Sequence, residues 1–338
     1  MPWSRIADRY RYRCRAGPEP GGQATDSASA GGGAGHGKVG MAKGEGTARA
    51  QARQVLEEQR RRRVRQQGFV AAGIAVALVA TAVVAMAIVK ITGDDEPVVL
   101  PSGAAAAEVI SQVTGVPPEV LDRVGKGEVG RLPVAIEDVP ALTVGDLPLV
   151  LYVGAEFCPF CASQRWAVVV ALSRFGTFTG LGLTYSASDD VYPNTQSLTF
   201  HGATFTSEYL VFQGVETATN VRQGSGYEPL DSLTPQQHQV MQTLNAPPYV
   251  EQRAAGSIPF MAIGNRYLVD GGSYSPEVLK GKSVTEIASA VGDPSTAIAT
   301  GIVGTANAMT TAICVLTGNR PGEVCNGAAA KAYASALR

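Results

Sequence analysis

The fold is decided by the segment Leu149-Val150-Leu151-Tyr152-Val153-Gly154-Ala155-Glu156-Phe157-Cys158-Pro159-Phe160-Cys161. Its first five residues are aliphatic, β-branched or aromatic, which predicts a buried strand that ends at Gly154. Residues 162–172 have helical length and contain no glycine or proline, so they predict a helix. The segment therefore predicts a strand, a turn and a helix, with Cys158 at the N-terminus of the helix.

This position favours a reactive thiol at Cys158. The free N–H groups and the positive end of the helix dipole stabilise a thiolate there, which lowers its pKa below the free value of about 8.5. Pro159 suits the first helical turn, where a missing N–H has no consequence. Cys161, one turn further on, is expected to be the less exposed, resolving thiol.

A structural disulfide and a zinc site are the alternatives for this cysteine pair. A disulfide within one helical turn closes too short a loop to stabilise the fold much. Zinc needs further ligands, and the histidines of the chain, His36, His201 and His238, are not paired at ligand spacing. We therefore expect no metal and no other cofactor.

A membrane span is predicted over residues 69–91. The chain has 338 residues, which suggests two or three units, and its net charge of −1 conceals an asymmetry. Residues 1–68 carry 14 Lys/Arg and 6 Asp/Glu, whereas residues 69–338 carry 14 and 23. Between the two lies an uncharged apolar run of 21 residues, 69–89, close to the ~20 that span a bilayer. A signal peptide, the alternative, starts nearer the N-terminus and has a shorter apolar core.

The charges on either side of this run predict its orientation. Arginines at 60–63 and 65 precede it, and Asp94, Asp95 and Glu96 follow it. The positive-inside rule places the N-terminus in the cytoplasm, so we expect a single-pass protein of the cell membrane with an extracytoplasmic C-terminal part. The arginines are expected to attract lipid headgroups of the bilayer, and no nucleic acid is expected as a partner. Four of the five cysteines fall outside, in an oxidising compartment.

The other boundaries follow from composition. Residues 1–50 are rich in Gly, Ala and Ser and predict disorder, and translation from Met41 is an alternative that removes residues 1–40. The outer part is predicted to contain helices at 104–113 and 118–124. The predicted units are a disordered segment (1–50), a basic juxtamembrane segment (51–68), the span (69–91), a linker (92–103), an N-terminal extension (104–144), the main domain (145–292) and a helical C-terminal extension (293–338).

Within the main domain, the pattern predicts an α/β fold. Residues 181–187 predict a second strand, and strand, helix and strand in sequence imply a parallel pair with a right-handed crossover. Residues 188–232 are interpreted as an insertion. A helix over 234–244 begins with Thr-Pro, and two short strands flank the Gly264-Asn265 turn. A last helix is predicted over 284–291.

In this order, residues 145–292 resemble the thioredoxin-like superfamily, which implies a central mixed sheet with flanking helices. The resemblance rests on the dithiol after a first strand and on Ile258-Pro259 immediately before a β-hairpin. It implies that Pro259 is cis and lies against the dithiol, where Ile258 and Pro259 bind the substrate chain. Phe160, between the cysteines, is expected to be exposed and to contact substrate.

A narrower resemblance covers most of residues 100–335. The run Gly154 to Cys161, with Arg165-Trp166, residues 173–176 and the late Cys314 and Cys325, is similar to an uncharacterised prokaryotic membrane family, domain of unknown function 929. This resemblance implies no biochemical role.

Three residues near the dithiol each have two interpretations. Glu156 is a proton acceptor for Cys161 or a surface carboxylate, since Glu is seldom buried. Arg165 stabilises a thiolate or faces solvent, as most helical arginines do. Trp166 is a core residue or a ligand platform, and the core is favoured.

The uncharged C-terminal stretch, residues 295–319, is a second span or a buried helix. Its threonines and glycines make insertion unfavourable, so a buried amphipathic helix is the better interpretation, with Ile298, Ile302, Met309, Ile313 and Leu316 on its apolar face. Cys314 and Cys325 then close a short loop, and such a disulfide is worth about 3 kcal/mol. We expect it to be structural, with a redox relay as the alternative.

The sequence thus predicts a membrane-anchored extracytoplasmic thiol–disulfide oxidoreductase that acts on protein cysteines. Cys158 forms the mixed disulfide and Cys161 resolves it. The Pro-Phe pair resembles the Pro-His and Pro-Tyr of oxidising relatives, which favours donation of disulfides. The expected partners are protein thiols or disulfides of the cell envelope and a membrane or soluble redox partner. The alternative is a non-catalytic binding or redox-sensing module of the same fold.

Overall fold

The computed structural model describes residues 97–337. The predictions for residues 1–50, 51–68 and 69–91, the alternative start at Met41 and the first part of the linker at 92–103 lie outside the described residues. The described residues belong to the part of the chain predicted to be extracytoplasmic.

A central strand and the helix after it confirm the opening prediction. Strand β3 (Leu147–Gly154) leads through residues 155–158 into helix α5 (Pro159–Leu172). Residues 149–154 are all buried because both faces of β3 are covered. Val150 and Tyr152 belong to the core on one face, and Leu149, Leu151 and Val153 belong to the core on the other.

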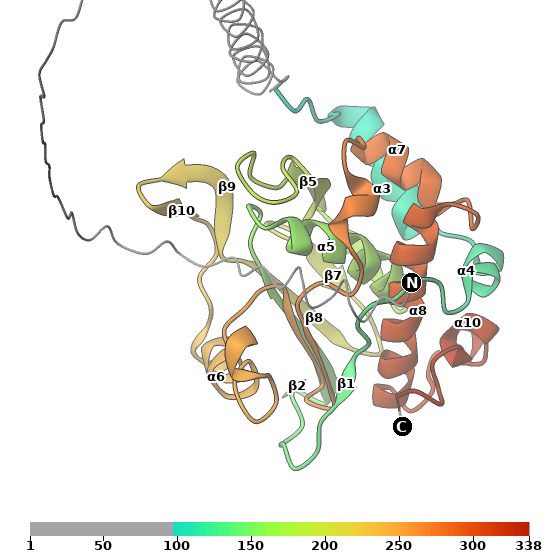
Figure 1. Ribbon diagram of the computed structural model, residues 1–338. Helices are drawn as coiled ribbons and strands as arrows, with labels where there is room; N and C mark the ends of the chain where they lie inside the picture. The colour runs from blue at the N-terminus through green and yellow to red at the C-terminus, as the bar shows by residue number, and fades with distance from the viewer. Residues whose placement is uncertain (1–96, 338) are drawn as a thin grey trace, which may run out of the picture. The chain divides into compact units, whose positions relative to one another are not determined.

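In the described part of the chain, six strands form a mixed central sheet around β3 (Figure 1). The order on one side is β11 (Phe260–Ile263), β12 (Tyr267–Asp270) and β1 (Val134–Ala135), each antiparallel to its neighbour. On the other side β3 pairs with β2 (Thr143–Val144) at its start and with β8 (Val211–Glu216) along its length. Only the β3 to β8 pairing is parallel.

The predicted partner of the first strand was wrong. Residues 182–185 form β5, which pairs antiparallel with β6 (Gln196–Thr199) in a separate two-stranded sheet. The parallel partner of β3 is β8, which lies within the segment 188–232 that was interpreted as an insertion. Both segments have strand-like composition, and consecutive strands are neighbours only about two-thirds of the time, so chain order alone did not decide the pairing.

Two further two-stranded sheets complete the segment between α5 and α6. Strands β4 (Thr177–Thr179) and β7 (Thr204–Thr206) pair with each other, and β9 (Ala218–Gln223) pairs with β10 (Gly226–Pro229). The β9–β10 hairpin projects from the end of β8 beyond the sheet (Figure 1). It begins two residues after the last residue of β8, next to the end of β3 that carries the dithiol.

The helices lie on both faces of the sheet. Helix α6 (Pro235–Leu244) covers one face, and its start is fixed by a capping box between Thr234 and Gln237. The other face is covered by α3 (Gly103–Thr114), α4 (Pro118–Val124), α5, α7 (Val284–Val291), α8 (Ala297–Leu316), α9 (Gly322–Cys325) and α10 (Ala328–Lys331). Three of these helices, α3, α4 and α7, correspond to the predicted segments 104–113, 118–124 and 284–291. The predicted helices are therefore confirmed to within a few residues.

Helix α8 is the one helix of residues 97–337 with the length and apolar composition of a membrane span. Most of it is buried inside the domain, where it packs against α5. Its apolar and polar residues are both buried, so it is a buried helix without the predicted amphipathic face.

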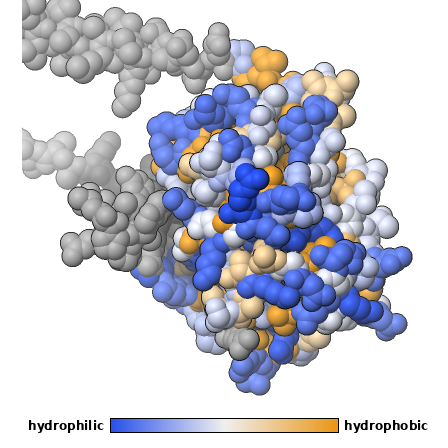
Figure 2. Space-filling view, turned by 90° about the vertical axis from the view of Figure 1, so that its right-hand side faces the viewer, coloured by the Kyte–Doolittle hydropathy of each residue, from blue (hydrophilic) through white to orange (hydrophobic). Residues whose placement is uncertain are grey.

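On the face of the molecule turned to the viewer in Figure 2, hydrophobic residues lie in small patches among hydrophilic ones.

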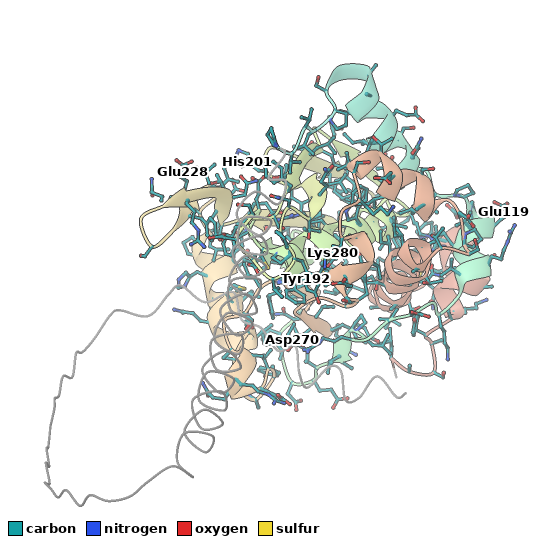
Figure 3. All side chains as sticks on the ribbon, turned by 45° about the horizontal axis from the view of Figure 1, so that its top comes forward. Glu119, Tyr192, His201, Glu228, Asp270 and Lys280 are labelled. Atoms are coloured by element: carbon teal, nitrogen blue, oxygen red, sulfur yellow. A yellow bond between two sulfur atoms is a disulfide. The ribbon has the colours of Figure 1, made fainter. Side chains whose placement is uncertain are left out.

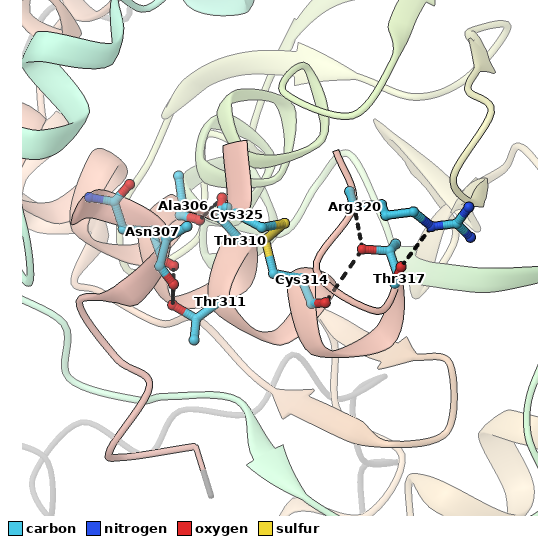
Figure 4. Close-up of a disulfide and its surroundings, with 9 residues drawn as sticks. Ala306, Asn307, Thr310, Thr311, Cys314, Thr317, Arg320 and Cys325 are labelled. Carbon is cyan, nitrogen blue, oxygen red and sulfur yellow. Dashed lines mark hydrogen bonds between the residues drawn. A yellow bond between two sulfur atoms is a disulfide. The ribbon is translucent and has the colours of Figure 1, made fainter. Parts of the chain in front are cut away.

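Cys314 and Cys325 are joined by a disulfide at the end of α8 (Figure 4). Leu316 of the same turn packs against Gly264, whose N–H donates to the carbonyl of Leu149 at the start of β3. The dithiol lies beyond the other end of β3, about 16 Å further along the strand at ~3.3 Å per residue. The disulfide and the dithiol therefore lie toward opposite ends of β3.

Candidate active site

Cys158 and Cys161 lie where the sequence predicts them, at the start of α5. Cys158 is the N-cap residue, with extended backbone angles, and Pro159 occupies the first helical position. Neither cysteine is in a disulfide. Both are 0% exposed, so the expectation that Cys158 is the more exposed thiol was wrong. The cover comes from chain segments that are distant in the sequence.

The segment before β11 is one of these. The Ile258–Pro259 peptide bond is cis. The Cys158 Sγ lies 3.9 Å from the Ile258 carbonyl oxygen, at hydrogen-bonding distance for a thiol, although the two residues are 100 positions apart. The Pro259 carbonyl in turn accepts from the N–H of Gly271 after β12, which fixes this loop over the dithiol. Ile258, one of the two residues expected to bind substrate, is therefore in contact with the sulfur of Cys158, and Pro259 is the next residue in the chain.

Two aromatic contacts close the site on the side of the hairpins. Phe157, immediately before Cys158, stacks on Tyr227 of β10 with ring centroids 4.2 Å apart. Phe160, between the cysteines, makes an edge contact with Tyr192 from the loop between β5 and β6. Tyr192 and the β10 residue Glu228 are labelled in Figure 3. Phe160 is half-buried, whereas the sequence predicted it to be exposed.

The stack on Phe157 is extended by charged residues. Arg222 of β9 lies over the ring of Tyr227 at 4.2 Å and forms an ion pair with Asp189. The Tyr227 hydroxyl donates to Asp189, and burial together with this carboxylate raises the pKa of Tyr227 to about 12. The hairpin is thus tied both to the loop that holds Tyr192 and to Phe157, the residue before Cys158.

A buried ion pair lies beneath the dithiol. Arg165 and Glu216 are both 0% exposed, and the guanidinium donates to both carboxylate oxygens at 2.7 and 2.8 Å. The same guanidinium donates to the Ala155 carbonyl in the turn before Cys158. The expectation that Arg165 faces solvent was wrong, because its charge is neutralised by a carboxylate on β8.

Glu216 is the site residue that sequence reasoning missed. It is the last residue of β8, and a charged residue at the buried end of a strand was the available signal. Burial raises its pKa, and Arg165 acts in the opposite direction. Glu156, the carboxylate proposed from the sequence, is half-exposed, and its N–H donates to the Ala218 carbonyl. The structure therefore offers an internal carboxylate at 216 and a surface one at 156.

Tyr152 completes the buried part of the site. It is 0% exposed, and burial raises its pKa well above the ordinary value, as do the neighbouring Cys161 and Glu216. Burial also raises the pKa of Cys161 well above its ordinary value, and a hydrogen bond with Cys158 adds to this. A bond that favours the neutral thiol is one in which Cys161 donates and Cys158 accepts. Burial and this hydrogen bond thus both favour the protonated, neutral form of Cys161.

The neighbouring α5 residues are structural. Trp166 is fully buried in the core, as favoured from the sequence, and its ring N–H donates to the Gln196 carbonyl. Gln164 exchanges two hydrogen bonds with Ser273 and so ties α5 to the loop after β12. Within residues 97–337, no group of three or more His, Cys, Asp or Glu side chains is placed to hold a metal ion.

The chain belongs to a family that is described as domain of unknown function (DUF929), which matches residues 140–315. The match covers 176 of 338 residues and contains both thiols, Arg165, Glu216 and Pro259. No curated protein and no solved structure matches the chain.

Proposed function

We propose that this protein is a membrane-anchored, extracytoplasmic thiol–disulfide oxidoreductase with a thioredoxin-like domain. The observation that carries the proposal is the contact of Cys158 with the Ile258 carbonyl, which brings a helix-capping thiol, a second thiol one turn away and a Pro-containing loop together. Each part alone is common, whereas their convergence at one end of a central strand is what dithiol exchange requires.

The topology supports the thioredoxin-like assignment. The chain runs through β3, α5, β8, α6, β11, β12 and α7, and the sheet contains the order β8-β3-β11-β12. Strand β11 is antiparallel to β3, and β8 is parallel to it. The elements follow one another along the chain as in the resemblance, with β8 in place of the strand predicted at 181–187.

The proposed reaction uses the sulfurs in sequence. In reduction of a substrate disulfide, the Cys158 thiolate attacks one substrate sulfur, a Cys158–substrate bond forms, and the other substrate sulfur leaves as a thiolate. Cys161 then loses its proton and attacks Cys158, the mixed disulfide breaks, and a Cys158–Cys161 disulfide forms with release of the second substrate thiolate. Oxidation of a substrate dithiol is the same sequence in reverse.

A base must accept the Cys161 proton in this scheme, and Glu216 is the proposed acceptor. It forms an ion pair with Arg165, it is buried and interacts electrostatically with Cys161, and burial raises its pKa, which makes it a stronger base. Glu156, half-exposed and electrostatically coupled to Glu216, is proposed to pass the proton to solvent.

Membrane anchoring is proposed from the apolar run at 69–89 alone. Alkaline carbonate extraction of native membranes tests it. The full chain should stay with the pellet, and a chain that lacks residues 69–89 should be released. Release of both would remove the anchor from the proposal and leave the dithiol chemistry to be judged separately.

A non-catalytic redox sensor is the second candidate, and the complete burial of both thiols favours it. A sensor cycles between thiol and disulfide without forming a covalent bond to a substrate protein. An oxidoreductase with these thiols must open its cover for each substrate.

Trapping of mixed disulfides separates the two. A Cys161→Ala chain cannot resolve its adducts, so it should accumulate Cys158-linked proteins of the cell envelope on non-reducing gels. The Cys158→Ala/Cys161→Ala chain is the matched control and should accumulate none. If the single variant forms no adducts, and the wild-type protein neither reduces nor rearranges a scrambled disulfide substrate, the enzyme proposal is wrong.

A further inference from the structure

Two buried polar atoms beneath the dithiol have no hydrogen-bond partner among residues 97–337. They are the Nη1 of Arg165 and the hydroxyl oxygen of Tyr152, both on side chains that are 0% exposed. The remaining donors of Arg165 are engaged with Glu216 and the Ala155 carbonyl. Buried donors are nearly always satisfied in native proteins, so two in one place call for an explanation, and a role in catalysis is one.

Both residues interact electrostatically with Cys161. Cys161 and Arg165 are four residues apart on α5 and therefore share one face of the helix. The Tyr152 hydroxyl is turned toward the end of β3, where a Cβ on Gly154 would overlap it. Gly154 pairs with Glu216 across the two strands. Tyr152, Arg165 and Glu216 thus meet at the end of β3, below the first turn of α5.

The charged state of Cys161 is the state that needs such donors. A thiolate without contact with solvent is strongly disfavoured unless hydrogen-bond donors or a cation replace the water. The charged and titratable groups around Cys161 are Cys158, Tyr152, Arg165 and Glu216, and Arg165 is the one that favours the thiolate.

We propose that the Nη1 of Arg165 and the hydroxyl of Tyr152 form a binding site for the Cys161 thiolate, and that the charge of Arg165 is then balanced by the sulfur in place of the Glu216 carboxylate. The inference rests on the proposed oxidoreductase function. The proton of Cys161 passes to Glu216, which becomes a neutral carboxylic acid. Arg165 is thereby left with a partner of lower charge and pairs with the new thiolate through its uncommitted Nη1, while Tyr152 donates its hydroxyl hydrogen to the same sulfur.

The exchange keeps the charge of the buried site constant. One anion and one cation are present before the proton moves, and one anion and one cation are present afterwards. No net charge is created in the interior, where an unpaired charge is costly. The same thiolate occurs in both directions of the reaction, as the nucleophile that resolves a mixed disulfide and as the leaving group when a substrate thiolate attacks the Cys158–Cys161 disulfide.

The test removes one hydroxyl. Tyr152→Phe in a Cys158→Ser chain should raise the pKa of Cys161, read from thiolate absorbance at 240 nm, by about one unit, which is a tenfold smaller thiolate fraction. In the otherwise wild-type chain, resolution of a preformed Cys158 mixed disulfide should slow about tenfold. Formation of that mixed disulfide should change less than about twofold, because Cys158 attacks in that step.

Tyr267→Phe is the matched control. It removes a buried hydroxyl that donates to the Leu337 carbonyl, far from the dithiol. It should leave both the Cys161 pKa and the resolution rate unchanged. A second variant, Arg165→Lys, keeps the charge but removes the Nη1 position, and it should slow resolution in the same way as Tyr152→Phe.

The inference is overturned if Tyr152→Phe leaves the Cys161 pKa and the resolution rate at their wild-type values. It is also overturned if the control variant lowers resolution as much as Tyr152→Phe does. Failure of the proposed function looks different, since no mixed disulfide then forms with any protein substrate. The pKa of Cys161 in the Cys158→Ser chain reports on the thiolate site in that case as well.

Discussion

The guanidinium of Arg165 and the carboxylate of Glu216 are 2.7 Å apart, and neither side chain has any surface in contact with solvent. Removing one member leaves the other as an uncompensated buried charge. We expect Arg165→Ala or Glu216→Ala to lower the free energy of unfolding by about 3–5 kcal/mol, measured by urea denaturation. Replacement of both by leucine should recover most of that loss. Equal losses for the single and double variants would contradict the pairing.

Stability should fall at alkaline pH, because burial raises the pKa of Cys161 well above its ordinary value. The unfolded thiol loses its proton near pH 8.5 while the folded thiol keeps it, so the contribution is present below that pH and is lost as the pH rises further. For this single group, the free energy of unfolding should fall by about 1.4 kcal/mol per pH unit.

Cys161→Ser tests this slope in reduced protein. Its free energy of unfolding should vary less steeply with pH between about 9 and 10 than that of the wild type. Tyr152 and Tyr274, whose pKa values are also raised by burial, should add to the slope only above about pH 10. A wild-type slope that Cys161→Ser leaves unchanged would show that Cys161 ionises freely in the folded state.

The contact between Phe157 and Tyr227 should control the reactivity of Cys158. Tyr227→Ala removes the stacked ring and should lower stability by about 1 kcal/mol. It should also speed alkylation of Cys158 by iodoacetamide, because Phe157, the residue before Cys158, loses its stacking contact with Tyr227. The rate is measured in a Cys161→Ser chain. Tyr227→Phe keeps the stack and should alkylate at the wild-type rate, so a fast rate in both variants would exclude the stack as the cause.

The Cys314–Cys325 disulfide should matter for stability and little for redox chemistry. It joins residues 11 positions apart at the end of the domain remote from the dithiol. Cys314→Ala/Cys325→Ala should lower the free energy of unfolding by about 3 kcal/mol, measured by denaturation under oxidising conditions. Trapping of substrates by Cys158 should persist in this chain. If the double variant fails to trap substrates at a temperature where the domain stays folded, the result would support a redox relay through Cys314 and Cys325.

Helix α8 should not tolerate a larger side chain at Gly304, where it packs against the backbone of residues 126 and 127. A Cβ on Gly304 would lie 2.6 Å from the Lys126 carbonyl oxygen and 3.0 Å from the Gly127 Cα. Gly304→Val should therefore cost about 1–3 kcal/mol of stability, measured by thermal or urea unfolding. Val315→Ala, at a half-exposed position of the same helix, is the control and should have little effect. An unaffected Gly304→Val chain would be consistent with a helix that faces lipid.

Much of the secondary structure was predictable because its signals are local. The Thr234 capping box, the glycine at the end of β3 and the apolar spacing of residues 284–291 lie within the elements they delimit. The pairing of β3 with β8 was not predictable in this way, because β5 and β8 have similar composition and the choice depends on packing across the whole domain.

The site residues also differ in whether local sequence or only the folded structure identifies them. The two thiols and Pro259 could be found from spacing and from the resemblance. The burial of Cys158 could not, since Tyr192, Tyr227 and Ile258 come from three segments that are remote in the sequence. Arginine and glutamate usually lie at the protein surface. Arg165 and Glu216 are 51 positions apart in the sequence, and both are buried because they form an ion pair in the folded chain.

The enclosure of Cys158 also determines which reagents the sulfur can meet at rest. Hydrogen peroxide and small free thiols react with a thiolate only where they can touch it, and here the sulfur presents no surface to them. A protein substrate large enough to displace the surrounding loops gains access that a small oxidant does not have. We therefore expect the resting dithiol to resist sulfinic and sulfonic acid formation, so that its redox state follows encounters with proteins rather than the peroxide content of its surroundings.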